Sequence, residues 1–206
     1  LLAAELMGVG EDRRLIEQGD WLLYEQVVPQ RARGVDGYIS VNVSPRHFRS
    51  PDFGDRLLAM FEAHGADPAR LRLEITEVAL LDDAPRTLRI LRTLRQHGIL
   101  AQLDDFGTGF SALSYLHRFP ISVLKIDRSF VSGLGAEARP ESLALVRAIL
   151  ALAGTLGIET IAEGVETEEQ RSALIELGCH LGQGYLLGRP MASLEQVGVA
   201  DAVQAG

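Results

Sequence analysis

Two adjacent aspartates, Asp104 and Asp105, follow an apolar run and precede the glycine-containing turn Gly107-Thr-Gly109. Neighbouring carboxylates repel each other unless a cation lies close to both. Their oxygens are hard ligands, which favour Mg²⁺ or Mn²⁺ over softer metals. Two adjacent aspartates can also share a pair of ions, and paired ions assist displacement reactions at phosphorus. Taken together with the oxygen ligands Asn42, Glu74 and Glu163, the pair predicts metal-dependent hydrolysis of a phosphate ester.

Lys125 is the only lysine among the 20 basic side chains of the chain, and it lies in the apolar run Ile121–Asp127. Lysine carries a compact ammonium whose pKa can shift, whereas the arginine used everywhere else stays charged. This choice favours a chemical role, such as orienting or deprotonating a water or neutralising charge on a phosphate. The alternatives are a lysine left at this position by chance, or a lysine that reaches from a strand end to solvent.

Polar side chains stand at the same end of six apolar runs. They are Asn42, Glu74, Asp104 with Asp105, Lys125 with Asp127, Glu163 and Gln183. Any single one could be a helix N-cap, a role that Asp and Asn favour. Six together indicate a shared site, because the carboxyl ends of parallel strands form the sites of α/β proteins. The five histidines and one cysteine show no zinc-binding spacing, so we expect no zinc site.

The same six runs are the expected strands. They cover Tyr38–Val43, Leu71–Ile75, Leu100–Leu103, Ser122–Ile126, Glu159–Ala162 and His180–Tyr185. Helical signals separate them: a stripe of Ala84, Leu88, Leu91 and Leu94, a start at Pro140, a capping box at Thr167–Gln170, and a last helix after Ser193. This alternation predicts parallel strands and the α/β class. Strand ends that converge on one point favour a (β/α) barrel over an open sheet.

The bulk composition favours one globular domain over residues 1–206, with 47% hydrophobic residues. A net charge of −8 argues against a general binder of DNA or RNA polymers. With Cys179 as the single cysteine, and with no signal peptide or membrane span in the sequence, we expect a cytoplasmic location. The chain begins with Leu1 rather than Met, so we expect it to lack its natural N-terminus.

The turn after the aspartates has two other interpretations. Residues Gly107–Ala112 match the GxGxxA dinucleotide fingerprint, with Asp127 about 20 residues on. However, Asp104 and Asp105 would repel a pyrophosphate at that place. The Asp-Phe-Gly triplet also occurs in protein kinases, but the companion kinase motifs are absent from this sequence. The glycines are therefore interpreted as the hinge of a mobile loop.

Six motifs in this order resemble the EAL-type cyclic di-GMP phosphodiesterases of bacterial signalling. They are Val41–Ser44, Leu73–Glu77, Leu103–Gly109, Leu124–Phe130, Ala162–Thr167 and Gln183–Pro190. Each motif alone is modest evidence, but together they are specific to this family. The resemblance implies a TIM-like (β/α)8 barrel and hydrolysis of cyclic di-GMP to linear pGpG, by water attack assisted by two Mg²⁺ or Mn²⁺ ions.

The resemblance also implies roles for individual residues. The ligands of one metal would be Asn42, Glu74 and Asp104, and those of the second would be Asp104 and Asp105. Lys125 and Glu163 would position and activate water, with Gln183 near the same centre. Glu77 would anchor the mobile loop after Asp105. Substrate contacts would come from Asp105, Gln183 and Arg189.

The sequence departs from the family pattern at its amino-terminal side. The Glu-Ala-Leu motif is absent, and six strands are expected where the family has eight. We therefore expect an N-terminally incomplete EAL domain whose first two strands lie outside this chain. The alternative function is an inactive module that binds cyclic di-GMP or a partner protein. By analogy with the family, we expect a homodimer, with possible fusion to GGDEF, PAS, receiver or membrane sensor domains.

Overall fold

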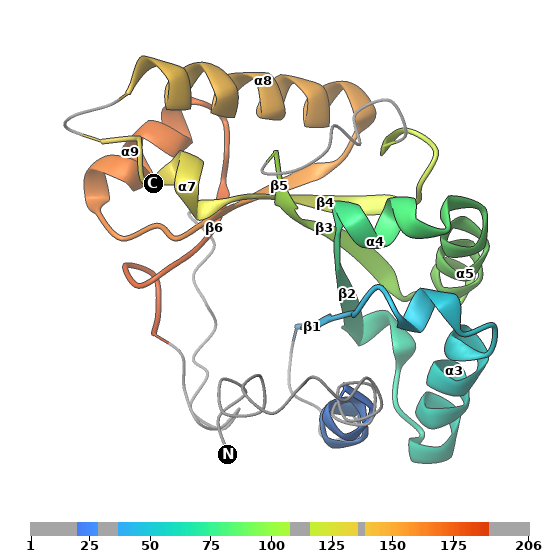
Figure 1. The fold of residues 1–206 in the computed structure, drawn as a ribbon. Helices are drawn as coiled ribbons and strands as arrows, with labels where there is room; N and C mark the ends of the chain where they lie inside the picture. The colour runs from blue at the N-terminus through green and yellow to red at the C-terminus, as the bar shows by residue number, and fades with distance from the viewer. Residues whose placement is uncertain (1–19, 29–36, 108–115, 136–138, 190–206) are drawn as a thin grey trace, which may run out of the picture. The chain divides into compact units, whose positions relative to one another are not determined.

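The computed structural model of the chain describes residues 20–28, 37–107, 116–135 and 139–189 (Figure 1). These residues form two compact units. The first comprises Leu1–Ala101 with Arg118–Pro120, and the second comprises Gln102–His117 with Ile121–Gly206. The last helix predicted from the sequence, after Ser193, lies outside the described residues.

The six predicted strands all form, and their order along the sheet is the order of the chain. They are β1 (Ile39–Asn42), β2 (Leu71–Thr76), β3 (Leu100–Phe106), β4 (Ile121–Ile126), β5 (Glu159–Glu163) and β6 (Leu181–Gln183). The pairs β1–β2, β4–β5 and β5–β6 are parallel. Sequential parallel strands joined by helices define the α/β class, so this prediction is confirmed.

In the first unit, helices follow β1 and β2. They are the 3-10 turn η1 (His47–Arg49), α3 (Phe53–His64), the 3-10 turn η2 (Pro68–Arg70), α4 (Glu77–Asp82) and α5 (Ala84–Gln96). Residues 20–28 are also helical. Gly65 takes a left-handed conformation at φ 59° and ends α3, a common way to stop a helix. The core is built from alternate β2 residues, Leu71, Leu73 and Ile75, and from apolar helix faces.

The buried face of α5 differs from the predicted stripe. Leu91 and Leu94 are buried as expected, but Thr87 and Ile90 complete the face in place of Ala84 and Leu88. Thr87 tolerates burial because its hydroxyl donates a hydrogen bond to the Ala79 carbonyl at 3.4 Å. A pattern of apolar residues alone does not predict such a satisfied threonine.

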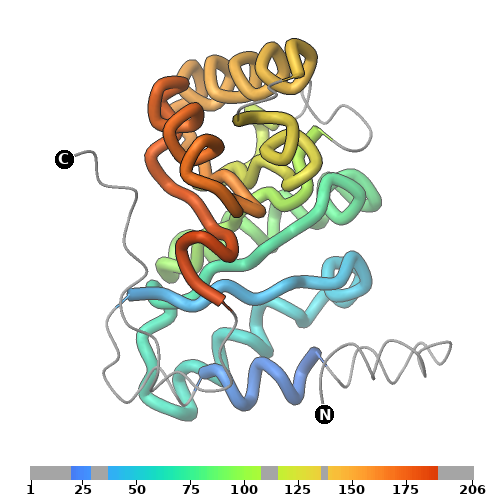
Figure 2. Tube along the Cα trace, turned by 90° about the vertical axis from the view of Figure 1, so that its left-hand side faces the viewer, coloured from blue at the N-terminus to red at the C-terminus, as the bar shows by residue number. Residues whose placement is uncertain are grey.

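In the second unit, helices cover β4 and β5. They are α7 (Arg128–Val131), α8 (Pro140–Leu156) and α9 (Glu168–Glu176). Helix α8 contacts both strands, and Figure 2 shows it along one side of this unit. Pro140 starts α8, as predicted, and Gly157, at φ 66°, ends it. The predicted capping box of Thr167 and Gln170 is present at the start of α9.

None of the helices formed by the described residues is long and apolar enough to cross a membrane.

Candidate active site

Lys125 lies between two carboxylates in the second unit. Its Nζ is 3.1 Å from Oδ1 of Asp104 and 2.6 Å from Oε1 of Glu163. The residue is only 4% exposed, so the ammonium is held inside the protein and does not reach bulk solvent. The alternative interpretation of a solvent-seeking lysine is therefore wrong. A buried ammonium needs such partners, because an unpaired buried charge is costly.

The strand register explains why these groups meet. In the parallel pair β4–β5, Lys125 stands opposite Ile161, and Glu163 lies two residues further along β5. Side chains two residues apart on a strand share one face, so Lys125 and Glu163 project to the same side of the sheet. The lysine side chain is long enough to reach the Glu163 carboxylate, two residues beyond the residue opposite Lys125.

Asp104 and Asp105 lie inside β3, whereas the sequence predicted them just after the strand. The strand continues to Phe106, which is buried. Asp105 has a left-handed backbone at φ 52°, a conformation that is uncommon for residues other than glycine, asparagine and aspartate. Its N–H donates a hydrogen bond to Oδ1 of Asp104 at 3.1 Å. The Asp104 carboxylate therefore accepts from both the Asp105 backbone and the Lys125 ammonium.

The carboxylates of Asp104, Asp105 and Glu163 offer oxygens that all lie within 4.8 Å of one another. Partial burial raises the pKa of Asp105, and the negative charges of Asp104 and Asp127 raise it further, while Lys125 opposes them. The site thus concentrates more negative charge than its one ammonium balances. Hard oxygen donors in this arrangement fit a divalent cation such as Mg²⁺ or Mn²⁺.

Gln183 is brought beside Glu163 by the last strand pair. The two residues stand opposite each other in the β5–β6 register. The Gln183 carbonyl also accepts a hydrogen bond from the Val165 N–H at 3.0 Å, which extends the pairing past the end of β5. Gln183 is exposed at this strand end.

Asn42 and Glu74 form a second polar pair, in the first unit. They stand opposite each other in the parallel β1–β2 register, at or near the carboxyl ends of their strands. The Val43 N–H donates a hydrogen bond to the Glu74 carbonyl at 2.9 Å, which continues the ladder beyond Asn42. Because the two side chains share one face, an amide oxygen and a carboxylate are presented together.

Two other predicted residues lie on neighbouring elements. Glu77 is buried at the first position of α4, directly after β2. A carboxylate suits this place because the amino terminus of a helix carries partial positive charge. Arg189 is exposed, and its guanidinium lies 4.8 Å from the ring centre of Tyr185. The loop that Glu77 is predicted to anchor falls within residues 108–115, outside the described part of the chain.

One ion pair near this site was missed by the sequence analysis. Arg128, just after β4, contacts Glu166, after β5, with Nη2 and Oε1 2.8 Å apart. Gly164 allows this approach: it has φ 66°, and a Cβ there would collide with the Arg128 side chain. The pair joins the segments that follow Lys125 and Glu163. Its only signal in the sequence is that both residues lie within the quoted motifs.

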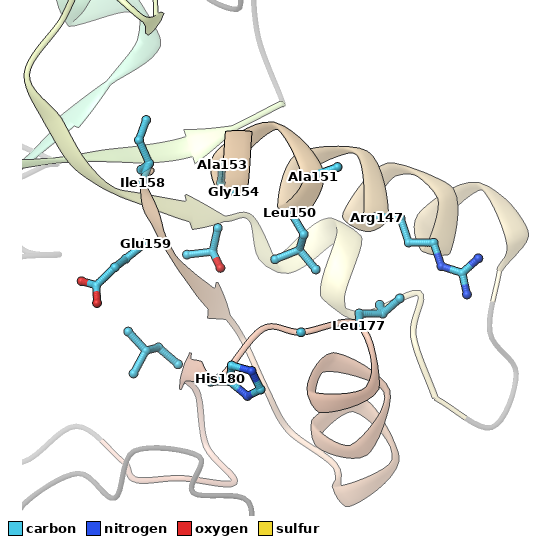
Figure 3. A pocket seen from close by; sticks show the side chains of 12 residues that line it. Arg147, Leu150, Ala151, Ala153, Gly154, Ile158, Glu159, Leu177 and His180 are labelled. Carbon is cyan, nitrogen blue, oxygen red and sulfur yellow. The ribbon is translucent and has the colours of Figure 1, made fainter. Parts of the chain in front are cut away.

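The second unit also has a cavity of about 530 Å³ away from these groups (Figure 3). Its lining includes Arg147 and Leu150 of α8, Glu159 at the start of β5, and His180 and Leu181 at the start of β6. These are the amino ends of the strands, whereas Lys125 and Glu163 lie at the carboxyl ends. The cavity is therefore separate from the acidic cluster.

A family model described as the EAL domain matches residues 1–190. The chain belongs to the EAL domain family. It is similar to MucR of Pseudomonas aeruginosa, a bifunctional diguanylate cyclase/cyclic di-GMP phosphodiesterase, at 41% identity over 181 residues, which covers 86% of this chain and 26% of MucR. It is also similar to the cyclic di-GMP phosphodiesterase RocR of the same organism, at 37% identity, covering 89% of this chain and 47% of RocR. The chain thus spans half or less of the length of these relatives.

Solved structures agree with this assignment. The MucR phosphodiesterase in complex with cyclic di-GMP matches with a TM-score of 0.85 and 37% identity, over 96% of this chain and 81% of that one. BlrP1 of Klebsiella pneumoniae, in a complex with manganese and cyclic di-GMP, matches with a TM-score of 0.77 and 27% identity, over 91% of this chain and 48% of that one. The predicted TIM-like α/β fold of EAL type is therefore confirmed.

Proposed function

We propose that this domain hydrolyses cyclic di-GMP to linear pGpG. The observation that carries the proposal is the buried Lys125 held between Asp104 and Glu163, with Asp105 beside them. Relatives named as cyclic di-GMP phosphodiesterases support the choice of substrate. A site with surplus negative charge suits an anionic phosphodiester only when cations are present, so the reaction would depend on a divalent metal.

We propose that the domain binds two Mg²⁺ or Mn²⁺ ions. We assign Asp104 and Asp105 as ligands, because their oxygens lie close together and repulsion between them is relieved by a cation. We also assign Asn42 and Glu74, which offer an amide oxygen and a carboxylate from adjacent strand positions. When bound, such ions would polarise the phosphate and lower the pKa of a coordinated water.

Lys125 and Glu163 would then handle the water and the developing charge. A carboxylate such as Glu163 can accept a proton from a water within hydrogen-bond reach. The Lys125 ammonium, 2.6 Å from Glu163, would hold this carboxylate in place and stabilise negative charge that builds up on the phosphate. Glu77 is assigned as anchor of the following loop. Gln183 and Arg189 are assigned to substrate contacts, together with Asp105.

The test is an assay of the full-length protein with cyclic di-GMP and Mg²⁺ or Mn²⁺, in which pGpG is separated and quantified. We expect metal-dependent turnover that EDTA abolishes. Lys125→Arg should lower kcat by about 10²-fold or more despite keeping the charge, because a forked guanidinium cannot occupy the place of a compact ammonium. Binding of cyclic di-GMP without release of pGpG would contradict the enzyme and favour the binding module.

We also propose that the domain forms a homodimer through α8. Ala144, Ala148 and Ala151 are exposed at i, i+4 and i+7, and Leu145 beside them is 38% exposed. An apolar stripe of this kind on the outside of a helix supports pairing with a second copy. The cytoplasmic location and the fusion to other signalling domains remain predictions from the sequence.

A further inference from the structure

The helical segment 20–28 lies against α3 in the first unit (Figures 1 and 2). It is held there by aromatic rings: Trp21 and Tyr24 both contact Phe53 at the start of α3, with ring centres 5.8 and 6.5 Å apart. The Arg56 guanidinium, also on α3, lies 3.8 Å from the ring centre of Trp21. Helical segment 20–28 is thus anchored on one side by aromatic and cation–π contacts with α3.

The same segment reaches the end of β1 through two polar contacts. Tyr24 is 1% exposed, and its hydroxyl donates a hydrogen bond to the Asn42 carbonyl at 3.2 Å. Asp20 stands one turn earlier on the same helical face, and its Oδ2 is 3.0 Å from Nε2 of the buried His47. His47 in turn stacks on Phe53, with ring centres 4.9 Å apart. Both contacts hold the segment to residues 42–47.

These contacts matter because of the peptide group that they hold. The peptide that joins Asn42 to Val43 has its carbonyl bonded to the Tyr24 hydroxyl and its N–H bonded to the Glu74 carbonyl. It is therefore fixed at both ends, once by helical segment 20–28 and once by β2. Burial and the nearby charge of Asp20 raise the pKa of Tyr24, so its phenol remains a neutral donor.

We propose that Tyr24 is a positioning residue for the metal site, acting by fixing the backbone of Asn42. This inference rests on the proposed function, in which Asn42 and Glu74 are metal ligands. Groups that orient a ligand contribute to metal affinity without touching the metal, and their loss weakens binding by about 10- to 100-fold. Because Tyr24 acts on the backbone of Asn42, we expect an effect at the lower end of that range.

The test is a calorimetric titration with Mn²⁺, without substrate, of the wild-type protein and of Tyr24→Phe. The variant keeps the ring and removes only the hydroxyl, so the aromatic cluster should stay intact. We expect its Mn²⁺ Kd to rise by about 10-fold. In the hydrolysis assay the Mn²⁺ concentration for half-maximal rate should rise similarly, while kcat at saturating Mn²⁺ recovers.

Two controls separate positioning from stability. Tyr38→Phe removes a hydroxyl from an exposed tyrosine just before β1 and should leave the Kd unchanged. Ile90→Val shortens a side chain in the buried face of α5. It should lower the Tm by about 2–4 °C, the same decrease that loss of the Tyr24 hydrogen bond causes, but it should leave the Mn²⁺ Kd unchanged. A Kd for Tyr24→Phe equal to that of wild type, or an equal rise in Ile90→Val, would overturn the inference. Failure of wild type to bind Mn²⁺ would instead overturn the proposed function.

Discussion

The charge on Lys125 keeps the acidic cluster together when no cation is bound. Its ammonium contacts Asp104 and Glu163 directly, whereas Asp105 lies next to two further negative charges, Asp104 and Asp127. The pKa of Asp105 is raised first by partial burial and then by these two negative charges, so its ionised form is disfavoured at this place. A residue that is unfavourable in the metal-free fold but offers a metal ligand is typical of a site shaped for binding.

We predict that Asp105→Asn raises the Tm of the metal-free protein at neutral pH. The change removes a charge that partial burial disfavours and that Asp104 and Asp127 repel, and asparagine tolerates the left-handed backbone of this position. The measurement is thermal unfolding in EDTA. Glu62→Gln, an exposed residue within α3, serves as the control for loss of one negative charge and should leave the Tm nearly unchanged.

The pH dependence of this gain has a definite sign. Because the pKa of Asp105 is raised on folding, the folded chain binds this proton more tightly than the unfolded chain. Ionised Asp105 therefore costs stability above the raised pKa, and the cost disappears as the pH falls to the ordinary range of a carboxyl, near 4. The advantage of Asp105→Asn should shrink over the same interval. An advantage that stays constant from pH 7 to about pH 4 would contradict the repulsion argument.

At the scale of elements, α9 follows directly from the segment that carries Glu163 to Thr167. The Thr167 hydroxyl accepts from the Gln170 N–H at 3.3 Å, and Gln170 Oε1 accepts from the N–H groups of Thr167 and Glu166 at 3.2 and 2.8 Å. Three backbone donors are thus satisfied at one helix end. The cap fixes where the strand segment turns into the helix.

We predict that Thr167→Ala destabilises the protein by about 1 kcal/mol and lowers the Tm by about 2–4 °C. Loss of the hydroxyl leaves the Gln170 N–H without its acceptor. The Gln170 side chain still accepts from the N–H groups of Thr167 and Glu166, so only this half of the reciprocal cap remains. Amide hydrogen exchange should rise first in the opening turn of α9. Ser172→Ala, exposed in the middle of the same helix, is the matched control and should cause no loss. Equal effects of the two changes would show that the cap contributes nothing.

Elements of this fold were predictable because their signals are local. Alternating strands, the proline at the start of α8 and the capping box of α9 all depend on residues within a few positions of one another. Contacts between distant residues left no such signal: Tyr24 and Asn42 are 18 positions apart, and Asp20 and His47 are 27 apart. Lys125 was found from the sequence for a different reason, since its residue type stands out against 19 arginines.

At the scale of the whole molecule, the apolar side of α8 bears on assembly. Helix α8 has two charged residues, Glu141 and Arg147, in its 17 residues, although it lies on the outside of its unit. A solvent-facing helix normally carries charged or polar residues on its outer face. The exposed stripe of Ala144, Leu145, Ala148 and Ala151 instead resembles the apolar centre of an interface between subunits.

We predict that Leu145→Glu converts a homodimer into monomers. In a two-fold symmetric interface the same patch meets itself, so one substitution places two carboxylates in the contact and each is costly to bury. The measurement is molar mass by light scattering after size-exclusion chromatography, with the Tm followed in parallel to show that the subunit remains folded. Leu22→Glu, which changes a leucine that is 59% exposed on helical segment 20–28, is the matched control and should leave the mass unchanged. A wild-type protein that is monomeric, or a dimer that persists in Leu145→Glu, would show that the α8 stripe does not form the interface.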